Sequence, residues 1–216
     1  MEPQGRKKIS LHISEVQLNQ DLERYKNKAL DLGASQARII RADEIPVDER
    51  VILKCQVPRC FGYGVSAHCP PNTLKPAELK ICLAKYQWAI FFVSDVSPDI
   101  IVRDMDTVKQ LTAAYLKINK IVAVIESMAF YDGHYLAVGF GAGSCRYSFC
   151  LEEEDCQALK GNMCRFVLSA RPSMEAVGID VFKMVASAGW NIYPIGGNAK
   201  ACDVPKGVLA GIVIVQ

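Results

Sequence analysis

Apolar residues repeat with the period of an α-helix in two long segments of the chain. In the first segment, spacings of four and three residues define one helical face, and Gly33 stands where the helix would end. This face consists of Leu18, Leu22, Tyr25, Ala29 and Leu32. In the second segment, the same spacings continue over about six turns and predict an amphipathic helix that ends at Gly133. Its apolar face consists of Val108, Leu111, Tyr115, Ile118, Val122, Ile125 and Ala129.

Three shorter helical segments are predicted from local signals. Residues 46–54 and 77–87 have helical character. The third segment begins at Ser173, which is a suitable N-cap, and places Glu175 near the positive end of the helix dipole. This pattern predicts one helix that continues to Gly189 through Val177, Val181, Met184 and Ala188.

Uninterrupted apolar runs and short β-type segments predict the strands. Residues 88–93 form a run typical of a strand that is buried on both faces of a sheet. We expect a second inner strand at residues 135–140, and further strands at residues 37–40, 191–195 and 208–215. Residues 55–76 are rich in Gly, Pro and Cys and predict a loop, and residues 94–99 predict a turn. The pattern favours an α/β or α+β fold with helices around a central sheet, in a single domain at residues 16–216 after a polar tail at residues 1–15.

Composition and charge narrow the class of protein. Of the 216 residues, 50% are hydrophobic and 22% are charged, which excludes wholesale disorder. The net charge of +2 gives no reason to expect nucleic acid or an anionic membrane as a partner. The longest apolar runs are far shorter than the roughly 20 residues of a membrane-spanning helix, and residues 1–15 lack the apolar core of a secretory signal. We therefore expect a cytoplasmic protein.

Nine cysteines are the most unusual feature of the sequence, and eight of them fall in two groups. The first group is Cys55, Cys60, Cys69 and Cys82, and the second is Cys145, Cys150, Cys156 and Cys164. Cys202 stands alone. An odd number of cysteines without an export signal argues against a disulfide framework. Thiols gathered in two loop-like segments favour ligation of a soft metal, with reactive or merely buried thiols as the alternative.

The second group can close a metal site by itself, because its four cysteines lie within 20 residues. Zinc would bind four thiolates at about 2.3 Å, usually through a tight knuckle, whereas the gaps here are long for such a knuckle. An iron–sulfur cluster is wider and tolerates ligands spread along a longer loop, so the spacing favours a [4Fe-4S] cluster over zinc. Arg146 and Arg165, together with Arg171, flank the group and could offset the negative charge of a bound cluster. The alternative is that these arginines pair with the acidic residues 152–155.

The first group offers three close cysteines, Cys55, Cys60 and Cys69, and an uncertain fourth. Three interpretations remain open. Cys82 or Cys202 completes a second four-thiolate site, or three thiolates leave one metal position open for substrate or solvent, or these thiols only cover the cluster of the second group. His68, beside Cys69, is a candidate ligand or proton donor, although most single histidines in loops are neither.

Three features of the sequence together resemble the DUF2284 family. They are Cys60-Phe-Gly-Tyr-Gly followed by Cys69-Pro-Pro, the glycine-led group of four cysteines, and the segment Arg171-Pro-Ser-Met-Glu-Ala-Val-Gly-Ile-Asp180. Members of this family are bacterial and archaeal proteins that are described as predicted metal-binding and have no established reaction. The resemblance covers most of the chain. It implies that the metal ligands are Cys55, Cys60, Cys69, Cys145, Cys150, Cys156 and Cys164, while Cys82 and Cys202 lie outside its motifs.

The sequence therefore predicts one [4Fe-4S] cluster, or two, in a protein with a role in electron transfer or an accessory redox role. The alternatives are a zinc-binding structural or interaction module, and an enzyme that uses the open iron of a three-cysteine cluster. Whether the partner is a redox protein or a small-molecule substrate stays open, as does the question whether the chain is an enzyme. A homodimer would follow if the apolar strand at residues 208–215 lay at a sheet edge.

Overall fold

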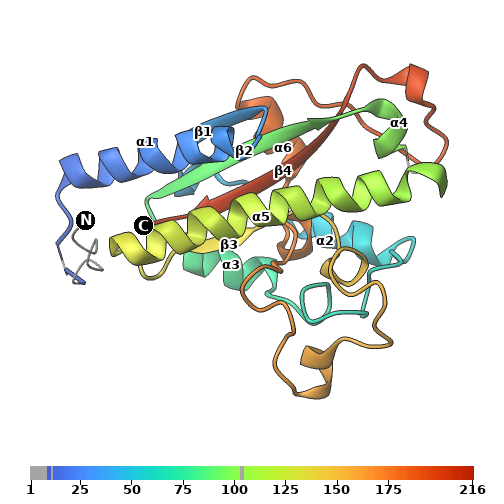
Figure 1. Cartoon of the computed structure of the whole chain (residues 1–216), viewed down its shortest axis with the longest axis horizontal. Coiled ribbons are helices and arrows are strands. Elements are labelled where there is room, and N and C mark those ends of the chain that lie inside the picture. The colour runs from blue at the N-terminus through green and yellow to red at the C-terminus, as the bar shows by residue number, and fades with distance from the viewer. Residues whose placement is uncertain (1–8, 11, 103–104) are drawn as a thin grey trace, which may run out of the picture.

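The computed structural model describes residues 9–10, 12–102 and 105–216, in which a four-stranded antiparallel sheet lies between two layers of helices (Figure 1). The strand order is β1-β2-β4-β3. The strands are β1 (Gln36–Arg41), β2 (Trp88–Val96), β3 (Val138–Phe140) and β4 (Gly207–Ile214). The helices are α1 (Glu15–Asp31), α2 (Glu49–Gln56), α3 (Pro76–Leu83), α4 (Pro98–Ile101), α5 (Val108–Asp132) and α6 (Val181–Ser187). The expected fold class is confirmed.

The sheet buries apolar side chains on both faces. Ile90, Phe92 and Val213 point to the face that α1 and α5 cover. Phe91 and Ile212 point to the opposite face, where they pack with side chains of α3 and α6. Successive side chains of a strand point to opposite faces, so an uninterrupted apolar run suits a strand that is covered on both. The prediction for residues 88–93 is confirmed.

The two long predicted helices are confirmed together with their ends. Gly33, just beyond α1, has a φ of +95°, and Gly133, just beyond α5, has a φ of +108°. Both values lie in the left-handed region, where a glycine is favoured after a helix. Within the described residues, no helix is long and apolar enough to cross a membrane.

Two strand boundaries were predicted wrongly. The expected turn at residues 94–99 is wrong at its start, because β2 continues to Val96 and keeps its pairing with β4. The inner strand expected at residues 135–140 is a three-residue edge strand, β3, which pairs only with β4. Tyr135 and Leu136 lie in an exposed turn, where the amide of Ala137 donates to the carbonyl of His134. The apolar side chains of this turn gave the sequence the alternation that predicted a strand.

The segment after the second cysteine group also differs from the prediction. Residues 191–195 form no strand; the neighbouring Trp190 stacks on Phe91 at 5.3 Å between ring centroids, so this region packs on the sheet without joining it. The single helix predicted from Ser173 to Gly189 is wrong as well. A 3-10 turn at Glu175–Val177 ends at Gly178, whose φ is +90°, and α6 then starts afresh with Asp180 as its N-cap. Asp180 accepts a hydrogen bond from the amide of Lys183 at 2.9 Å.

The position of β4 removes the proposed route to a dimer. β4 lies between β2, which pairs along the whole length of β4, and β3, which pairs with residues 212–214. The apolar strand that was expected to pair across a dimer is therefore an inner strand.

A series of glycines brings β3 and the start of the second cysteine loop against α5. A Cβ on Gly139 would stand 2.2 Å from Val122 Cγ1, and one on Gly141 would stand 2.7 Å from Asn119 Oδ1. A Cβ on Gly143 would meet the ring of Tyr115 at 2.7 Å. Only glycine allows this close approach of the backbone, which fixes the point where the loop leaves the sheet.

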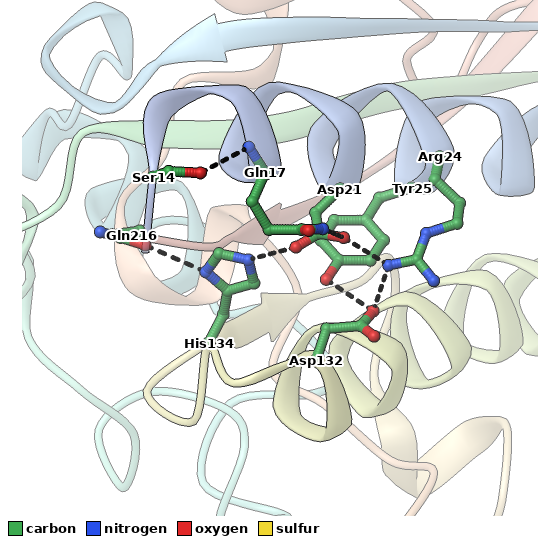
Figure 2. Close-up of polar contacts among 8 residues, drawn as sticks. All are labelled: Ser14, Gln17, Asp21, Arg24, Tyr25, Asp132, His134 and Gln216. Carbon is green, nitrogen blue, oxygen red and sulfur yellow. Dashed lines mark hydrogen bonds and ion pairs between the residues drawn. The ribbon is translucent and has the colours of Figure 1, made fainter. Parts of the chain in front are cut away.

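A buried polar network fastens α1 to the far end of α5 and to the last residue of the chain (Figure 2). The side chain of His134 is fully buried between Asp21 Oδ2, at 3.2 Å, and Gln216 Oε1, at 3.0 Å. Arg24 bridges Asp21 and Asp132, at 2.6 Å from an oxygen of each. The hydroxyl of Tyr25 donates to Asp132 at 2.9 Å. We call these residues the α1–α5 clasp; every polar group named here has a partner, as buried polar groups require.

Candidate metal centre

The four cysteines of the second group line one cavity. Cys145, Cys150, Cys156 and Cys164 share its wall with side chains of Phe166 and of a loop from the first group. The cavity is narrow, with about 20 Å³ open to the centre of a water molecule. We call it the four-thiol cavity. It brings together the four residues that were predicted to hold a cluster.

Short turns and one arginine shape the loop around this cavity. The loop leaves β3 through Gly143, whose φ is +71°, and enters a 3-10 turn at Cys145–Tyr147. The guanidinium of Arg146 lines the cavity and donates to the backbone carbonyls of Cys150, Glu153 and Glu154. A guanidinium offers five donors in a fixed plane, so one side chain can hold three carbonyls of a loop in place.

The other two arginines near the second group have acidic partners. Arg165 forms an ion pair with Glu153, one of the acidic residues that had been considered as an alternative partner. Arg171 pairs instead with Glu126 of α5, at 2.6 Å. Among the three, Arg146 is the one that lines the four-thiol cavity.

Burial favours the protonated form of two thiols of the cavity, Cys145 and Cys150. Desolvation, with the neighbouring sulfurs of Cys69, Cys150 and Cys156, raises the pKa of Cys145 to about 12, while the nearby hydroxyl of Ser66 opposes the rise. The pKa of Cys150 is also raised, first by desolvation and then by Cys164. These mutual effects place the sulfurs close enough to sense one another's charge. A cation in the cavity would replace the protons.

Two polar residues reach the four-thiol cavity from the first cysteine loop. Ser66 stands beside Cys145, and His68 lines the cavity wall. Nδ1 of His68 is buried and has no hydrogen-bond partner among the described residues. Desolvation, followed by the charge of Arg171, lowers the pKa of His68 and favours the neutral imidazole. A buried ring nitrogen without a partner fits a site that receives a further group.

All nine cysteines are free thiols, so none is joined to another in a disulfide. The thiols surround the cavity without meeting at one point. Within the described part of the chain, no three His, Cys, Asp or Glu side chains already stand close enough to hold one metal ion. Four thiols and an imidazole are nevertheless the donor groups that soft metals and iron–sulfur clusters bind.

The three close cysteines of the first group line a second and larger cavity, of about 790 Å³. We call it the three-thiol cavity. Cys55 lies in the last turn of α2, so the loop expected from residue 55 begins two residues later, after Gln56. Cys60 Sγ accepts a hydrogen bond from the amide of Gly62 at 3.4 Å. Neither Cys82 nor Cys202 lines this cavity, and both are exposed.

The two cavities adjoin. Cys69 Sγ lies 3.3 Å from Ser144 Oγ, and Ser144 precedes Cys145 in the chain. The hydroxyl of Tyr147 donates to the carbonyl of Phe61 at 3.3 Å, and the rings of Tyr147 and Phe61 pack edge to face. The two cysteine loops therefore lie side by side, below α5 in the view of Figure 1.

Glu175 is a site residue that sequence analysis missed. It lines the three-thiol cavity, and it raises the pKa of Cys55 after desolvation, Cys60 and Cys69. The predicted helix had assigned Glu175 to the helix dipole, but the helix does not begin there. Two backbone hydrogen bonds, from Asp48 to Gly178 and from Asp180 to Pro46, hold this segment against the start of α2. No signal in the sequence placed residue 175 beside residue 55.

Comparison with known proteins identifies one matching family. The model of the DUF2284 family, described as predicted metal-binding protein, matches residues 38–210. Comparisons with curated proteins and with solved structures find no match. The matched range includes both cysteine groups, His68 and Glu175. Because the match covers well over half of the chain, this protein belongs to the DUF2284 family of predicted metal-binding proteins.

Proposed function

We propose that this chain binds a [4Fe-4S] cluster in the four-thiol cavity, with Cys145, Cys150, Cys156 and Cys164 as its ligands. One observation supports this above the others: four thiols that are spread over 20 residues of a loop line a single cavity. Cubane clusters are held by four cysteine thiolates. Family membership supports the broader statement that the chain binds a metal.

The spacing of the ligands supports a cluster in preference to zinc. Zinc would have to draw four sulfurs to within about 2.3 Å of one ion. The thiols here stand on the walls of a cavity, separated by gaps of four, five and seven residues. A cluster is wider than one ion and tolerates ligands spread along a longer loop. The narrow cavity must open to admit it.

The chain's own residues would set the properties of the site. Arg146 fixes the loop backbone and adds a positive charge beside the ligands. Ser66 and His68 bring a hydroxyl and an imidazole to the sulfurs. Hydrogen bonds to sulfur and nearby charge are the means by which a protein tunes cluster potential. A bound cluster supplies one-electron chemistry, so we propose electron transfer or an accessory redox role, in a reducing compartment such as the cytoplasm.

The proposal is tested by anaerobic purification followed by iron, sulfide and zinc analysis. We expect a brown protein with visible absorption, about four iron and four sulfide per cluster, and little zinc. Cys150→Ser and Cys164→Ser should each lose most of this iron. Cys82→Ser is the matched control, because Cys82 is exposed and outside both cavities, and it should keep the iron. A colourless protein with one zinc per chain would support the zinc-binding module and overturn the cluster.

A second candidate function is an enzyme with an open metal position, and the three-thiol cavity favours it. Its volume of about 790 Å³ lies within the range of small-molecule sites. It is lined by three cysteines with no fourth, and it adjoins the four-thiol cavity through Cys69 and Ser144. Cys69→Ser tests whether Cys69 binds a metal or only covers the cluster of the second group. Unchanged metal content and redox signal would show that Cys69 binds no metal.

A further inference from the structure

The three-thiol cavity combines three soft donors with one carboxyl group. Cys55, Cys60 and Cys69 line it together with Glu175, which is the only acidic residue among the lining residues. Glu175 is exposed, so its carboxyl group is accessible from the cavity that it lines. The one basic lining residue, Arg59, places its guanidinium over the ring of Tyr63, at 5.3 Å from the centroid.

These four donors come from three separate segments that the fold brings together. Cys55 ends α2, Cys60 and Cys69 belong to the following loop, and Glu175 starts the 3-10 turn before α6. Backbone hydrogen bonds from Asp48 to Gly178 and from Asp180 to Pro46 hold the Glu175 segment against the start of α2. A Cβ on Gly62 would stand 3.6 Å from Cys69 Sγ. The amide of Gly62 donates to Cys60 Sγ at 3.4 Å, so the sulfurs of Cys60 and Cys69 both lie against Gly62.

We propose that Cys55, Cys60, Cys69 and Glu175 form a second metal centre, with three thiolates and one carboxylate, whose carboxylate position faces the three-thiol cavity. Carboxylate oxygen is a harder donor than thiolate and suits a soft metal less well. The Glu175 position is therefore the one that an incoming ligand displaces. This centre does not depend on the cluster in the four-thiol cavity.

The cavity itself determines what reaches the metal. Its walls include the aromatic side chains of Tyr63, Tyr115 and Tyr147 and the apolar side chains of Leu111 and Leu209. Such a cavity suits a small organic molecule that is mainly apolar and carries one metal-binding nitrogen, oxygen or sulfur atom. Thr112 of α5 also lines the cavity, whereas the next residue, Ala113, faces solvent.

The centre is tested with Co²⁺ as the probe in a full-length chain that carries Cys150→Ser and Cys164→Ser, so that the four-thiol cavity is disabled. We expect one cobalt per chain, with thiolate-to-cobalt charge-transfer absorption that Cys69→Ser reduces. Glu175→Gln should weaken cobalt binding by about tenfold or more. Glu175→Cys should restore binding and strengthen the charge-transfer absorption, because four thiolates then replace three.

Glu49→Gln is the matched control, since it removes the same charge from α2 but lies outside the three-thiol cavity. It should leave cobalt affinity and spectrum unchanged. Circular dichroism verifies that each variant is folded. If Glu175→Gln binds cobalt as tightly as its parent and Glu175→Cys leaves the spectrum unchanged, the mixed centre is wrong. Because the parent lacks two second-group cysteines, this result is independent of the proposed [4Fe-4S] cluster.

The open position is tested with imidazole added to the cobalt form. We expect its visible bands to shift as the imidazole nitrogen displaces the carboxylate. Thr112→Trp, which fills the cavity from α5, should prevent the shift, and Ala113→Trp on the exposed side of the same helix should not. A spectrum that imidazole leaves unchanged in the parent would overturn the exchangeable position.

Discussion

At the scale of the residue, Cys145 differs from the other three thiols of the four-thiol cavity because it is buried, whereas they are half-buried. Desolvation raises its pKa to about 12, against an ordinary value near 9. The metal-free fold therefore stabilises the protonated thiol, and this stability depends on pH in a definite direction.

In the metal-free protein, we expect the free energy of unfolding to fall as the pH rises above about 9. The unfolded Cys145 thiol ionises there, whereas the folded one keeps its proton until about pH 12, so stability is complete below pH 9 and is lost above it. The slope attributable to this thiol approaches about 1.4 kcal/mol per pH unit. Denaturant titrations between pH 8.5 and 10 measure it. Cys145→Ser should remove this contribution and Cys82→Ser should keep it; equal slopes in both variants would contradict the assignment.

His68 offers a second prediction at this scale. Its buried Nδ1 lines the four-thiol cavity without a partner among the described residues, so it can donate to a sulfur of a bound cluster. Such a hydrogen bond stabilises the more negative, reduced state. His68→Ala should therefore lower the reduction potential by about 40 mV, which corresponds to a hydrogen bond of about 1 kcal/mol. Protein-film voltammetry measures the shift, and His12→Ala, at an exposed histidine, should leave the potential unchanged. A potential that is the same in all three proteins would remove His68 from the site.

The sequence identified the donors that are recognisable by residue type and spacing, but not those that the fold supplies. Cysteines 145 to 164 were predicted as one site because they are close in the chain. Ser66 reaches that cavity from a loop about 80 residues earlier, and Glu175 reaches Cys55 across 120 residues. Serine and glutamate are common residues with ordinary roles in turns and helix ends. Only the tertiary contacts distinguish these two from the rest.

At the scale of the element, long amphipathic segments were predictable and short ones were not. α1 and α5 follow a regular apolar period and end at glycines with positive φ. Between Ser173 and Gly189 the same period continues across Gly178, where a left-handed conformation interrupts the helix. Spacing cannot reveal that a glycine adopts a positive φ, and Asp180 as the true N-cap became evident only with the structure.

Close contact between β3 and α5 predicts the effect of a single added methyl group. Gly139→Ala would place its Cβ 2.2 Å from Val122 Cγ1 and 2.8 Å from Glu126 Oε2. We expect a loss of about 1–3 kcal/mol in the free energy of unfolding, as for other overpacked cores. Combining it with Val122→Ala should cost less than the sum of the two single changes, because the smaller side chain makes room. Gly196→Ala, with open space at its Cβ, is the control. Strict additivity in denaturant titrations would contradict the close contact.

At the scale of the whole molecule, the α1–α5 clasp and the cysteine loops lie toward opposite ends of α5. The three-thiol cavity contacts α5 between Val108 and Tyr115, whereas Asp132 of the clasp is its last residue. Tyr115 and Asp132 are separated along the helix by about 26 Å at 1.5 Å per residue. The clasp therefore holds α1 and α5 together at one end of α5, and the loops of the metal sites lie at the other end.

This separation predicts that the clasp affects stability but not metal content. Asp21→Ala removes the carboxylate partner of the buried His134 and one partner of Arg24 (Figure 2). We expect a loss of about 2 kcal/mol or more in the free energy of unfolding, because a buried polar group is left unpaired. Iron per folded chain should equal that of the wild type. A variant that stays folded but loses iron would show that the two ends are coupled.

The location of the metal is tested most directly by anomalous X-ray diffraction at the iron edge, on crystals grown anaerobically from the protein as purified. The account predicts an iron peak inside the four-thiol cavity, bounded by Cys145, Cys150, Cys156 and Cys164, with His68 beside it. An iron peak elsewhere with none in this cavity, or a peak there at the zinc edge alone, would contradict it.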